Sequence, residues 1–469
     1  PVVMAGLLLF SPESVKDRLF SLIDLKDWTL QARFFLWKGG WEIFKDYPIT
    51  GCGFKCVDFI HAQYPDPSGY ISRLRGMHSN IFQLLVDIGI LGFAAWLSIW
   101  VAYLLTMYKK WSQLANDNRG LVMGSTAAVM GFLAGGLFET NFYDSEIVML
   151  LFFIMGISLA KVKKAPMAEN ITFSIDRVLN INRILWLDKV IQFSLFTFVA
   201  FSMFSITITQ IAFSIGSISW LWKVHLTQTW KEVIGTRVGI AIFCFCLACL
   251  VAVGTSFDLE HSFIHLKKLL QFIVFFWVIN TVQDEKQRDL LIGTLIVAGV
   301  AAALYGLSPY WEGGLLEVGR IHGTRSTVAT FAGILMIVSL VTLGRFLFHK
   351  PTEYWVLGST SIIGLCLLLI LARQAWLGFF IGMIFLLFFW NKKYLLIIPL
   401  LIAGLLFFAP ANIKDRMHTF GNIGENSFQS RVILWQGGWK IFKDYPITGC
   451  GFKCVDAIHT QYTDPKGYL

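Results

Sequence analysis

The stretch that decides the fold runs from Arg33 (Arg33-Phe-Phe-Leu-Trp-Lys-Gly-Gly-Trp41) through Asp46-Tyr-Pro-Ile-Thr-Gly-Cys-Gly-Phe54 to His78-Ser-Asn80. It is polar and punctuated by glycine and proline, which is typical of loops, and it lies between apolar runs long enough to cross a bilayer. The stretch also occurs twice. Arg431 repeats Arg33 and Tyr468 repeats Tyr70, so the two copies are 398 positions apart. The second copy stops at Leu469, before its His-Ser-Asn.

The composition indicates a polytopic membrane protein. The chain has 469 residues, of which 56% are hydrophobic and 15% are charged, against about 25% charged in a soluble domain. Together with apolar runs long enough to cross a bilayer, this composition predicts an all-α fold that spans the membrane. The net charge of +9 is to be interpreted loop by loop, because Lys and Arg gather in cytoplasmic loops. It therefore predicts no nucleic-acid partner.

The apolar runs group into two partial units. Residues 1–165 are expected to be the C-terminal part of one unit, with a large loop at 11–80. Residues 166–189 are expected to form a cytoplasmic linker or the start of a second unit, residues 190–410 its transmembrane part, and residues 411–469 a truncated second copy of the loop. The two parts complement each other, so one full unit is expected to have about 12 spans. The predicted spans are 81–107, 121–138, 147–160, 190–222 (a helical hairpin), 238–254, 264–282, 290–307, 327–348, 354–371, 375–390 and 394–408.

Loop charges predict the orientation in the membrane. If the lysine-rich segment 161–189 is cytoplasmic, the other strongly basic turns also fall inside, and the large loop falls outside. The chain begins at Pro1 and ends within the second loop, so we expect a fragment. Two origins remain open, either neighbouring reading frames joined into one chain or a functional polyprotein.

Arginines at the outer ends of the predicted helices are the first candidates for chemistry. Arg325 opens the 327–348 span, Arg373 interrupts an apolar stretch, and Arg33 and Arg431 begin the two loop copies. Charges at membrane depth are costly and usually face a cavity or a partner, and a guanidinium binds phosphate through paired hydrogen bonds. The alternative is an arginine that reaches the lipid headgroups.

Other loop residues add candidates with open alternatives. His78 lies where the loop re-enters the membrane, so its imidazole is either a general base or a solvated side chain. Trp37, Trp41 and Tyr70 suit stacking on sugars or an interfacial aromatic belt. Cys52 and Cys56 form a local disulfide or remain as two thiols. The cysteine spacing does not suit zinc, and no Walker or dinucleotide motif occurs, so we expect no metal and no cofactor.

These motifs together resemble a known family. The Arg-x3-Trp motif from Arg33, the Asp-Tyr-Pro-Ile-Thr-Gly-Cys-Gly-Phe segment and His78-Ser-Asn-Ile-Phe-Gln-Leu-Leu-Val-Asp-Ile-Gly-Ile-Leu-Gly92 resemble the signature of the O-antigen ligase and O-antigen polymerase family. Gly323-Thr-Arg325-Ser-Thr-Val-Ala and Ala372-Arg373-Gln-Ala-Trp376 resemble its arginine segments, the second with Ala for the usual Ser and Gln for Gly. The resemblance covers nearly the whole chain in permuted order.

The resemblance implies a glycosyltransferase of the bacterial inner membrane that acts on its periplasmic side. The donor would be a glycan on undecaprenyl diphosphate, and the acceptor lipid A–core, another glycan or a protein. Arg325, Arg373, Arg33 and Arg431 would bind the diphosphate, and His78 would orient or deprotonate the acceptor hydroxyl. The alternatives are a polysaccharide polymerase of the same superfamily and, less favoured, a non-enzymatic anion or bicarbonate transporter.

Overall fold

A computed structural model describes residues 28–53, 55–60, 64, 78–111, 116–160, 175–230, 235–255, 259–313, 323–324, 327–349, 353–370 and 372–396. The chain forms two compact units, one of residues 1–10 with 397–469 and one of residues 11–396. Every described residue belongs to the second unit. That unit contains sequence from both partial copies.

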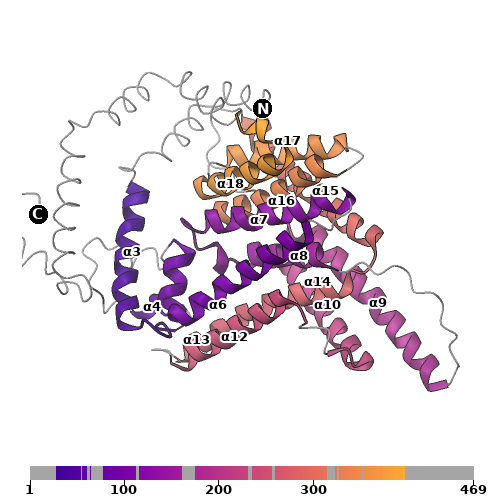
Figure 1. Cartoon of the computed structure of the whole chain (residues 1–469), viewed down its shortest axis with the longest axis horizontal. Coiled ribbons are helices and arrows are strands. Elements are labelled where there is room, and N and C mark those ends of the chain that lie inside the picture. The colour runs from indigo at the N-terminus through magenta and orange to yellow at the C-terminus, as the bar shows by residue number, and fades with distance from the viewer. Residues whose placement is uncertain are drawn as a thin grey trace, which may run out of the picture. The chain divides into compact units, whose positions relative to one another are not determined.

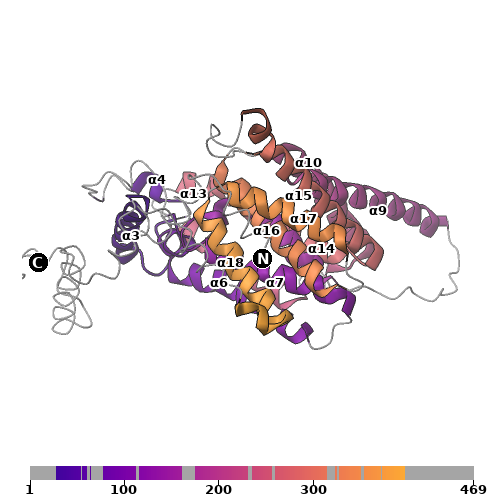
Figure 2. The same ribbon diagram turned by 90° about the horizontal axis from the view of Figure 1, so that it is seen from above.

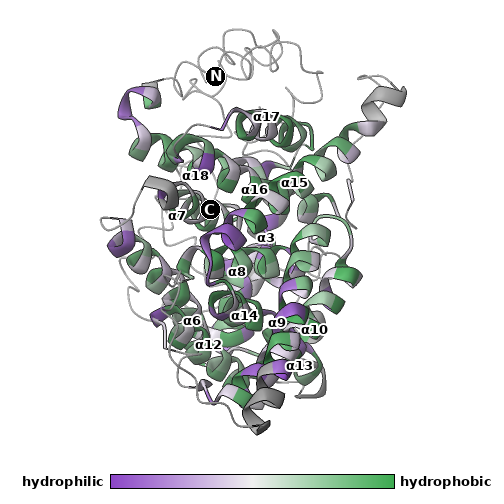
Figure 3. Ribbon diagram, turned by 90° about the vertical axis from the view of Figure 1, so that its right-hand side faces the viewer, coloured by the Kyte–Doolittle hydropathy of each residue, from purple (hydrophilic) through white to green (hydrophobic). Residues whose placement is uncertain are grey.

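Every regular element in the described residues is a helix (Figure 1). Seven helical segments there are long and apolar enough to span a membrane, and three shorter helices are also apolar. The hydrophobic colouring along most helices in Figure 3 agrees with this. The chain is a multi-pass membrane protein. The helices are α3 (Trp28–Asp46), α4 (Val57–Ile60), α6 (Asn80–Trp111), α7 (Asn116–Gly135), η2 (Asn141–Tyr143), α8 (Ser145–Leu159), α9 (Ile175–Phe201), α10 (Ile206–Thr227), α12 (Arg237–Gly254), α13 (Leu259–His265), η3 (Leu266–Phe272), α14 (Ile273–Thr281), α15 (Glu285–Gly313), α16 (Val328–Phe348), α17 (Tyr354–Leu369), α18 (Arg373–Trp390) and η4 (Lys392–Leu396).

The predicted hairpin at 190–222 is present as α9 and α10, which pack side by side (Figure 2). The structure differs from the sequence analysis just before it, because α9 begins at Ile175, inside the segment expected to be a linker. The buried residues Leu187, Ile191 and Leu195 are spaced by four, so one helical face continues across the predicted boundary.

The predicted span at 264–282 is interrupted. It consists of α13, the 3₁₀ helix η3 and α14, and η3 carries Lys267 and Lys268. The ammonium group of Lys268 donates a hydrogen bond to the carbonyl of Tyr143. A charged group at this depth needs such a partner, and the break in the helix coincides with it. The predicted span at 394–408 lies outside the described residues beyond Leu396.

Close packing at glycines joins the two halves of the unit. A Cβ on Gly124 would lie 2.8 Å from the Cα of Val341, and one on Gly344 would lie 2.4 Å from the Cα of Gly124. Two turns further along α7, a Cβ on Gly131 would lie 2.8 Å from the carbonyl oxygen of Gly378. Small residues let membrane helices approach to backbone contact. Helix α7, from the first part of the chain, therefore packs directly against α16 and α18 from the second (Figure 1).

The loop is docked on a kink in α6. Gly89 has a φ of 60° inside that helix, which interrupts the regular hydrogen-bond pattern. The N–H groups of Ile90 and Leu91 bond instead to the carbonyls of Pro48 and Ile49, at 3.1 and 3.3 Å. The N–H of Gly53 donates to the carbonyl of Asp87 at 3.0 Å. The loop thus satisfies backbone groups that the kink leaves open.

The first prediction concerns Gly89. An added Cβ would lie 2.3 Å from the carbonyl oxygen of Ile49, at a φ that L-residues rarely adopt. We expect Gly89→Ala to lower the free energy of unfolding by about 1–3 kcal/mol or more and to expose the loop to protease, as measured by thermal unfolding and limited proteolysis. Gly358→Ala is the control, because nothing lies within 4 Å of its added Cβ. Equal stability of the two variants would contradict the docking.

Candidate functional site

His78 and Glu139 form the centre of the candidate site. The Nδ1 atom of His78 lies 3.0 Å from Oε1 of Glu139, and the two side chains are 30% and 20% exposed. His78 precedes α6, and Glu139 lies in the turn between α7 and α8. His78 also has a φ of 44°, a conformation that costs energy in a residue with a Cβ. Such strain gathers at functional sites when the surrounding structure holds it in place.

Asn80 fixes the position of this pair. Its backbone N–H donates to the carbonyl of Gly136 at 2.7 Å, and its side-chain amide donates to Oδ1 of Asn141 at 2.6 Å. Its side-chain oxygen accepts from the N–H of Phe142 at 3.1 Å. A Cβ on Gly136 would lie 2.2 Å from Nδ2 of Asn80, so only glycine fits there. The start of α6 is therefore bonded to the turn that carries Glu139.

Opposing effects set the charge of Glu139. Burial raises the pKa of its carboxyl group, but the hydrogen bond and charge of His78, the charge of Arg33 and the N–H of Thr140 outweigh burial. The net pKa lies below its ordinary value, so the carboxylate is ionised at neutral pH. The effect of Arg33 also shows that α3 brings this arginine close enough to act on the pair.

Arg373 begins α18 beside the same turn. A Cβ on Gly135 would lie 3.0 Å from the carbonyl oxygen of Gln374, the residue after Arg373. Gly135 precedes Gly136, whose carbonyl accepts the backbone hydrogen bond from Asn80. Ala372, before it, gives α18 no side-chain cap. The indole N–H of Trp376 donates to the carbonyl of Leu367 at 3.0 Å, which ties the start of α18 to α17. The structure thus brings the start of α18, with Arg373, and His78 to one junction, although they belong to different partial copies.

Helix α3 packs against the loop and α6 through an apolar face. Leu36 and Ile43 are fully buried there with the two loop cysteines. The Trp37 ring stacks on Phe82 with centroids 5.1 Å apart, which occupies one of its faces. Trp41, in contrast, is 44% exposed. Of the described aromatic candidates, Trp41 has the more accessible ring.

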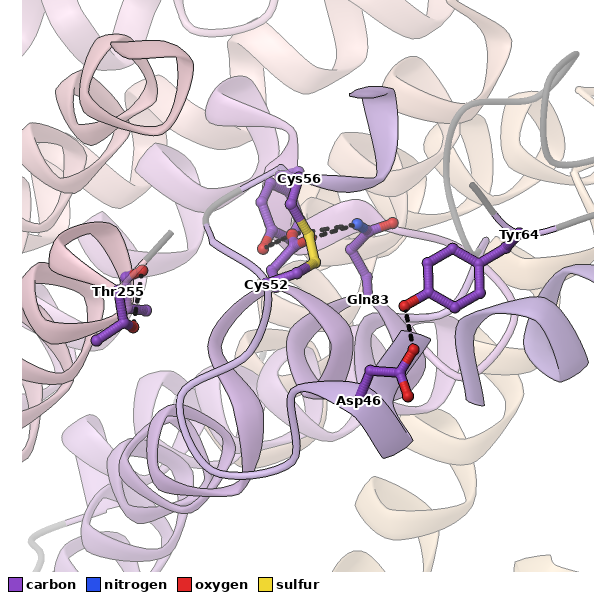
Figure 4. Close-up of a disulfide and its surroundings, with 9 residues drawn as sticks. Asp46, Cys52, Cys56, Tyr64, Gln83 and Thr255 are labelled. Atoms are coloured by element: carbon purple, nitrogen blue, oxygen red, sulfur yellow. Dashed lines mark hydrogen bonds between the residues drawn. A yellow bond between two sulfur atoms is a disulfide. The ribbon is translucent and has the colours of Figure 1, made fainter. Parts of the chain in front are cut away.

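Cys52 and Cys56 are joined by a disulfide in the structure (Figure 4). Both residues are buried, and Sγ of Cys56 contacts Oδ1 of Asp87 at 3.7 Å. The buried carboxylate of Asp87 accepts hydrogen bonds from the Gln83 amide at 3.1 Å and from the Tyr143 hydroxyl. The loop, α6 and η2 are therefore connected through one carboxylate.

Some predicted residues fall outside the described part of the chain. These are Arg325, Arg431 and Tyr70. Near Arg325, Thr324 donates to the carbonyl of Met203 and Thr327 caps α16. Thr330 in turn donates to Asp144, the residue that caps α8. The described residues hold no group of three His, Cys, Asp or Glu side chains placed to bind a metal ion.

Comparison with known proteins gives a family. The family model described as O-antigen ligase matches residues 2–97 and 358–468. Both segments are therefore similar to the O-antigen ligase family. It is a family of enzymes, and each matched segment carries one copy of the loop. No curated protein and no solved structure matches the chain.

The match to the O-antigen ligase family covers most of the candidate residues. The first segment includes Arg33 and His78, and the second includes Arg373 and Arg431. Arg325 and Glu139 lie between the two segments. The sequence analysis missed Glu139 and Asn80. Asn80 stands two residues after His78 in the quoted motif, and Glu139 was visible only as the start of a short acidic turn between two spans.

The second prediction tests the junction. Asn80→Ala removes the side-chain hydrogen bonds to Asn141 and Phe142, so we expect the free energy of unfolding to fall by about 2–4 kcal/mol. Circular dichroism during thermal unfolding in detergent measures this. Asn280→Ala is the control, because its amide donates only within α14, to Phe276. A loss no larger than that of the control would show that Asn80 does not fix the turn.

Proposed function

We propose that this membrane enzyme transfers a glycan from an undecaprenyl-diphosphate carrier to an acceptor such as lipid A–core. The observation that carries the proposal is the junction of His78 with the start of α18, at Arg373. The two residues lie in the two segments that match the family, and the turn at Gly135–Gly136 lies against both Asn80 and Gln374. Such a site holds a proton acceptor beside a group that binds phosphate.

The reaction is a substitution at the anomeric carbon of the donor sugar. The acceptor hydroxyl loses its proton to His78, and its oxygen forms a bond to that carbon. The bond between the anomeric carbon and the phosphate oxygen breaks, and its electron pair leaves on undecaprenyl diphosphate. His78 then releases the proton to solvent, so the enzyme returns to its starting state. A base held within reach of the hydroxyl typically contributes about 10²–10⁴-fold to the rate.

Arginines stabilise the leaving diphosphate. A guanidinium presents fixed N–H donors that pair with phosphate oxygens, and its charge offsets the charge that develops there. Arg373 stands at the first position of α18, where the helix dipole adds positive potential. Arg33 enters from α3. By their resemblance to the family segments, Arg325 and Arg431 are assigned the same role.

The membrane orientation follows from loop charge. The basic turns predict that the loop and His78 face the periplasm across the bacterial inner membrane. The loop repeat is direct rather than inverted, and inverted repeats are typical of transporters, so transport is disfavoured. A polymerase would use the same site with another glycan as acceptor.

The third prediction tests the transfer. In liposomes that hold the full chain, a lipid-linked glycan and lipid A–core, we expect His78→Ala and Arg373→Ala each to lower kcat by about 10²-fold or more. Gel analysis of glycan on each lipid is the measurement. Arg183→Ala is the control, since Arg183 is exposed on α9. Full transfer by both site variants would refute the proposal, whereas ladders of longer lipid-linked glycan would identify a polymerase.

The fourth prediction separates the two tryptophans. Trp41→Ala removes an exposed ring, so we expect KM for the glycan donor or acceptor to rise by about two- to twelvefold, from a stacking loss of about 0.5–1.5 kcal/mol, with little change in stability. Trp37→Ala removes a ring packed on Phe82, so we expect a lower unfolding temperature. Steady-state kinetics and thermal unfolding of both variants measure this. An unchanged KM for Trp41→Ala would remove its assigned role in sugar stacking.

A further inference from the structure

We propose that Glu139 is a positioning residue for the reaction, one that makes a specific nitrogen of His78 the base. Its carboxylate accepts the Nδ1 proton of His78, which leaves Nε2 as the atom that takes the proton of the acceptor hydroxyl. This inference rests on the proposed function for its kinetic consequence. The pairing of the two side chains is a property of the fold that is measurable without catalysis.

The contact itself determines the tautomer. An ionised carboxylate carries no proton and only accepts hydrogen bonds. Since Oε1 of Glu139 lies 3.0 Å from Nδ1 of His78, Nδ1 must be the donor. In a neutral imidazole only one nitrogen carries a proton, so the lone pair is on Nε2.

The backbone holds Glu139 in this position independently of His78. Its Oε1 atom also accepts from the N–H of Thr140 at 3.2 Å. The turn that carries Glu139 is bonded to the start of α6 through Asn80, two residues after His78. The backbone contacts of Glu139 and of Asn80 thus fix the positions of both residues, so the two side chains are held close together before substrate binds.

The charge of Glu139 acts in the same direction as its geometry. A carboxylate beside an imidazole stabilises the imidazolium that forms when the base takes a proton. The charge of Arg33 on α3 also acts on the pair, since it lowers the pKa of Glu139, and a positive charge there disfavours a second one on the imidazole. Within the pair, the charge of Glu139 therefore favours proton transfer to His78 and offsets the effect of Arg33.

The test compares the full-chain enzyme in liposomes with Glu139→Gln and Glu139→Asp. Glutamine keeps an oxygen for the hydrogen bonds but has no charge, and aspartate keeps the charge on a shorter side chain. We expect Glu139→Gln to lower kcat about 10–100-fold with KM for the lipid-linked donor nearly unchanged. The imidazole then loses its proton at lower pH, so the acidic limb of the pH–rate profile should move down by up to about one pH unit. For Glu139→Asp, the acidic limb of the pH–rate profile should stay at its wild-type pH, and part of kcat should be restored.

Glu285→Gln is the control, because Glu285 is 61% exposed.

A second measurement needs no catalysis. Diethyl pyrocarbonate modifies neutral imidazole, and mass spectrometry of the peptide that holds His78 reports labelling as a function of pH. We expect the midpoint for His78 to move to lower pH in Glu139→Gln and not in Glu285→Gln. An unmoved midpoint with wild-type kcat in Glu139→Gln would overturn the inference. If the wild-type chain transfers no glycan, the proposed function fails, and the labelling midpoint still decides whether Glu139 controls His78.

Discussion

The candidate site depends on the docking of the loop against the kinked helix α6. At Gly89 the helix leaves N–H groups without their usual partners, and a buried unpaired N–H costs about 1–3 kcal/mol. The carbonyls of Pro48 and Ile49 satisfy these groups, so the chain has to return to α6 at that point. Because α3 ends directly before these residues, the docking also places α3, with Arg33, over the start of α6. One set of backbone bonds therefore positions a candidate phosphate ligand relative to the candidate base.

Glycine contacts explain how two partial copies form one body. Helix α7 reaches backbone contact with α16 at Gly124 and Gly344, and with α18 at Gly131 and Gly378. In a membrane, helices gain little from hiding apolar surface, so close packing of this kind supplies much of their association. The contacts lie on the helix that ends at the turn before Glu139. Packing along α7 thus places the start of α18 and the start of α6 against the same turn at Gly135–Gly136, although these segments are distant in the chain.

Much of the fold follows from the sequence, and less of the site does. Apolar run length predicted the hairpin of α9 and α10 and most of the other described spans, since each run has to satisfy its own backbone in the membrane. It did not predict the early start of α9 or the break at η3. Hydropathy is averaged over a window of residues. The early start of α9 depends instead on the apolar face that one helix presents, and the break at η3 coincides with a single lysine, Lys268, that bonds to the carbonyl of Tyr143. Glu139 was missed for a related reason, because its role arises from a contact with a residue 61 positions away.

The charges of the site are interdependent. Arginines suited to a diphosphate also create a positive potential that makes protonation of a nearby imidazole unfavourable, by an amount that grows as water is excluded. A site built only from Arg33, Arg373 and His78 would therefore bind the donor at the expense of its base. Glu139 offsets that potential at His78, and the charge of Arg33 in turn keeps the pKa of Glu139 low. In the proposed mechanism, the cation that opposes the imidazolium thus preserves the carboxylate that stabilises it, so phosphate binding and proton transfer would be compatible in one site.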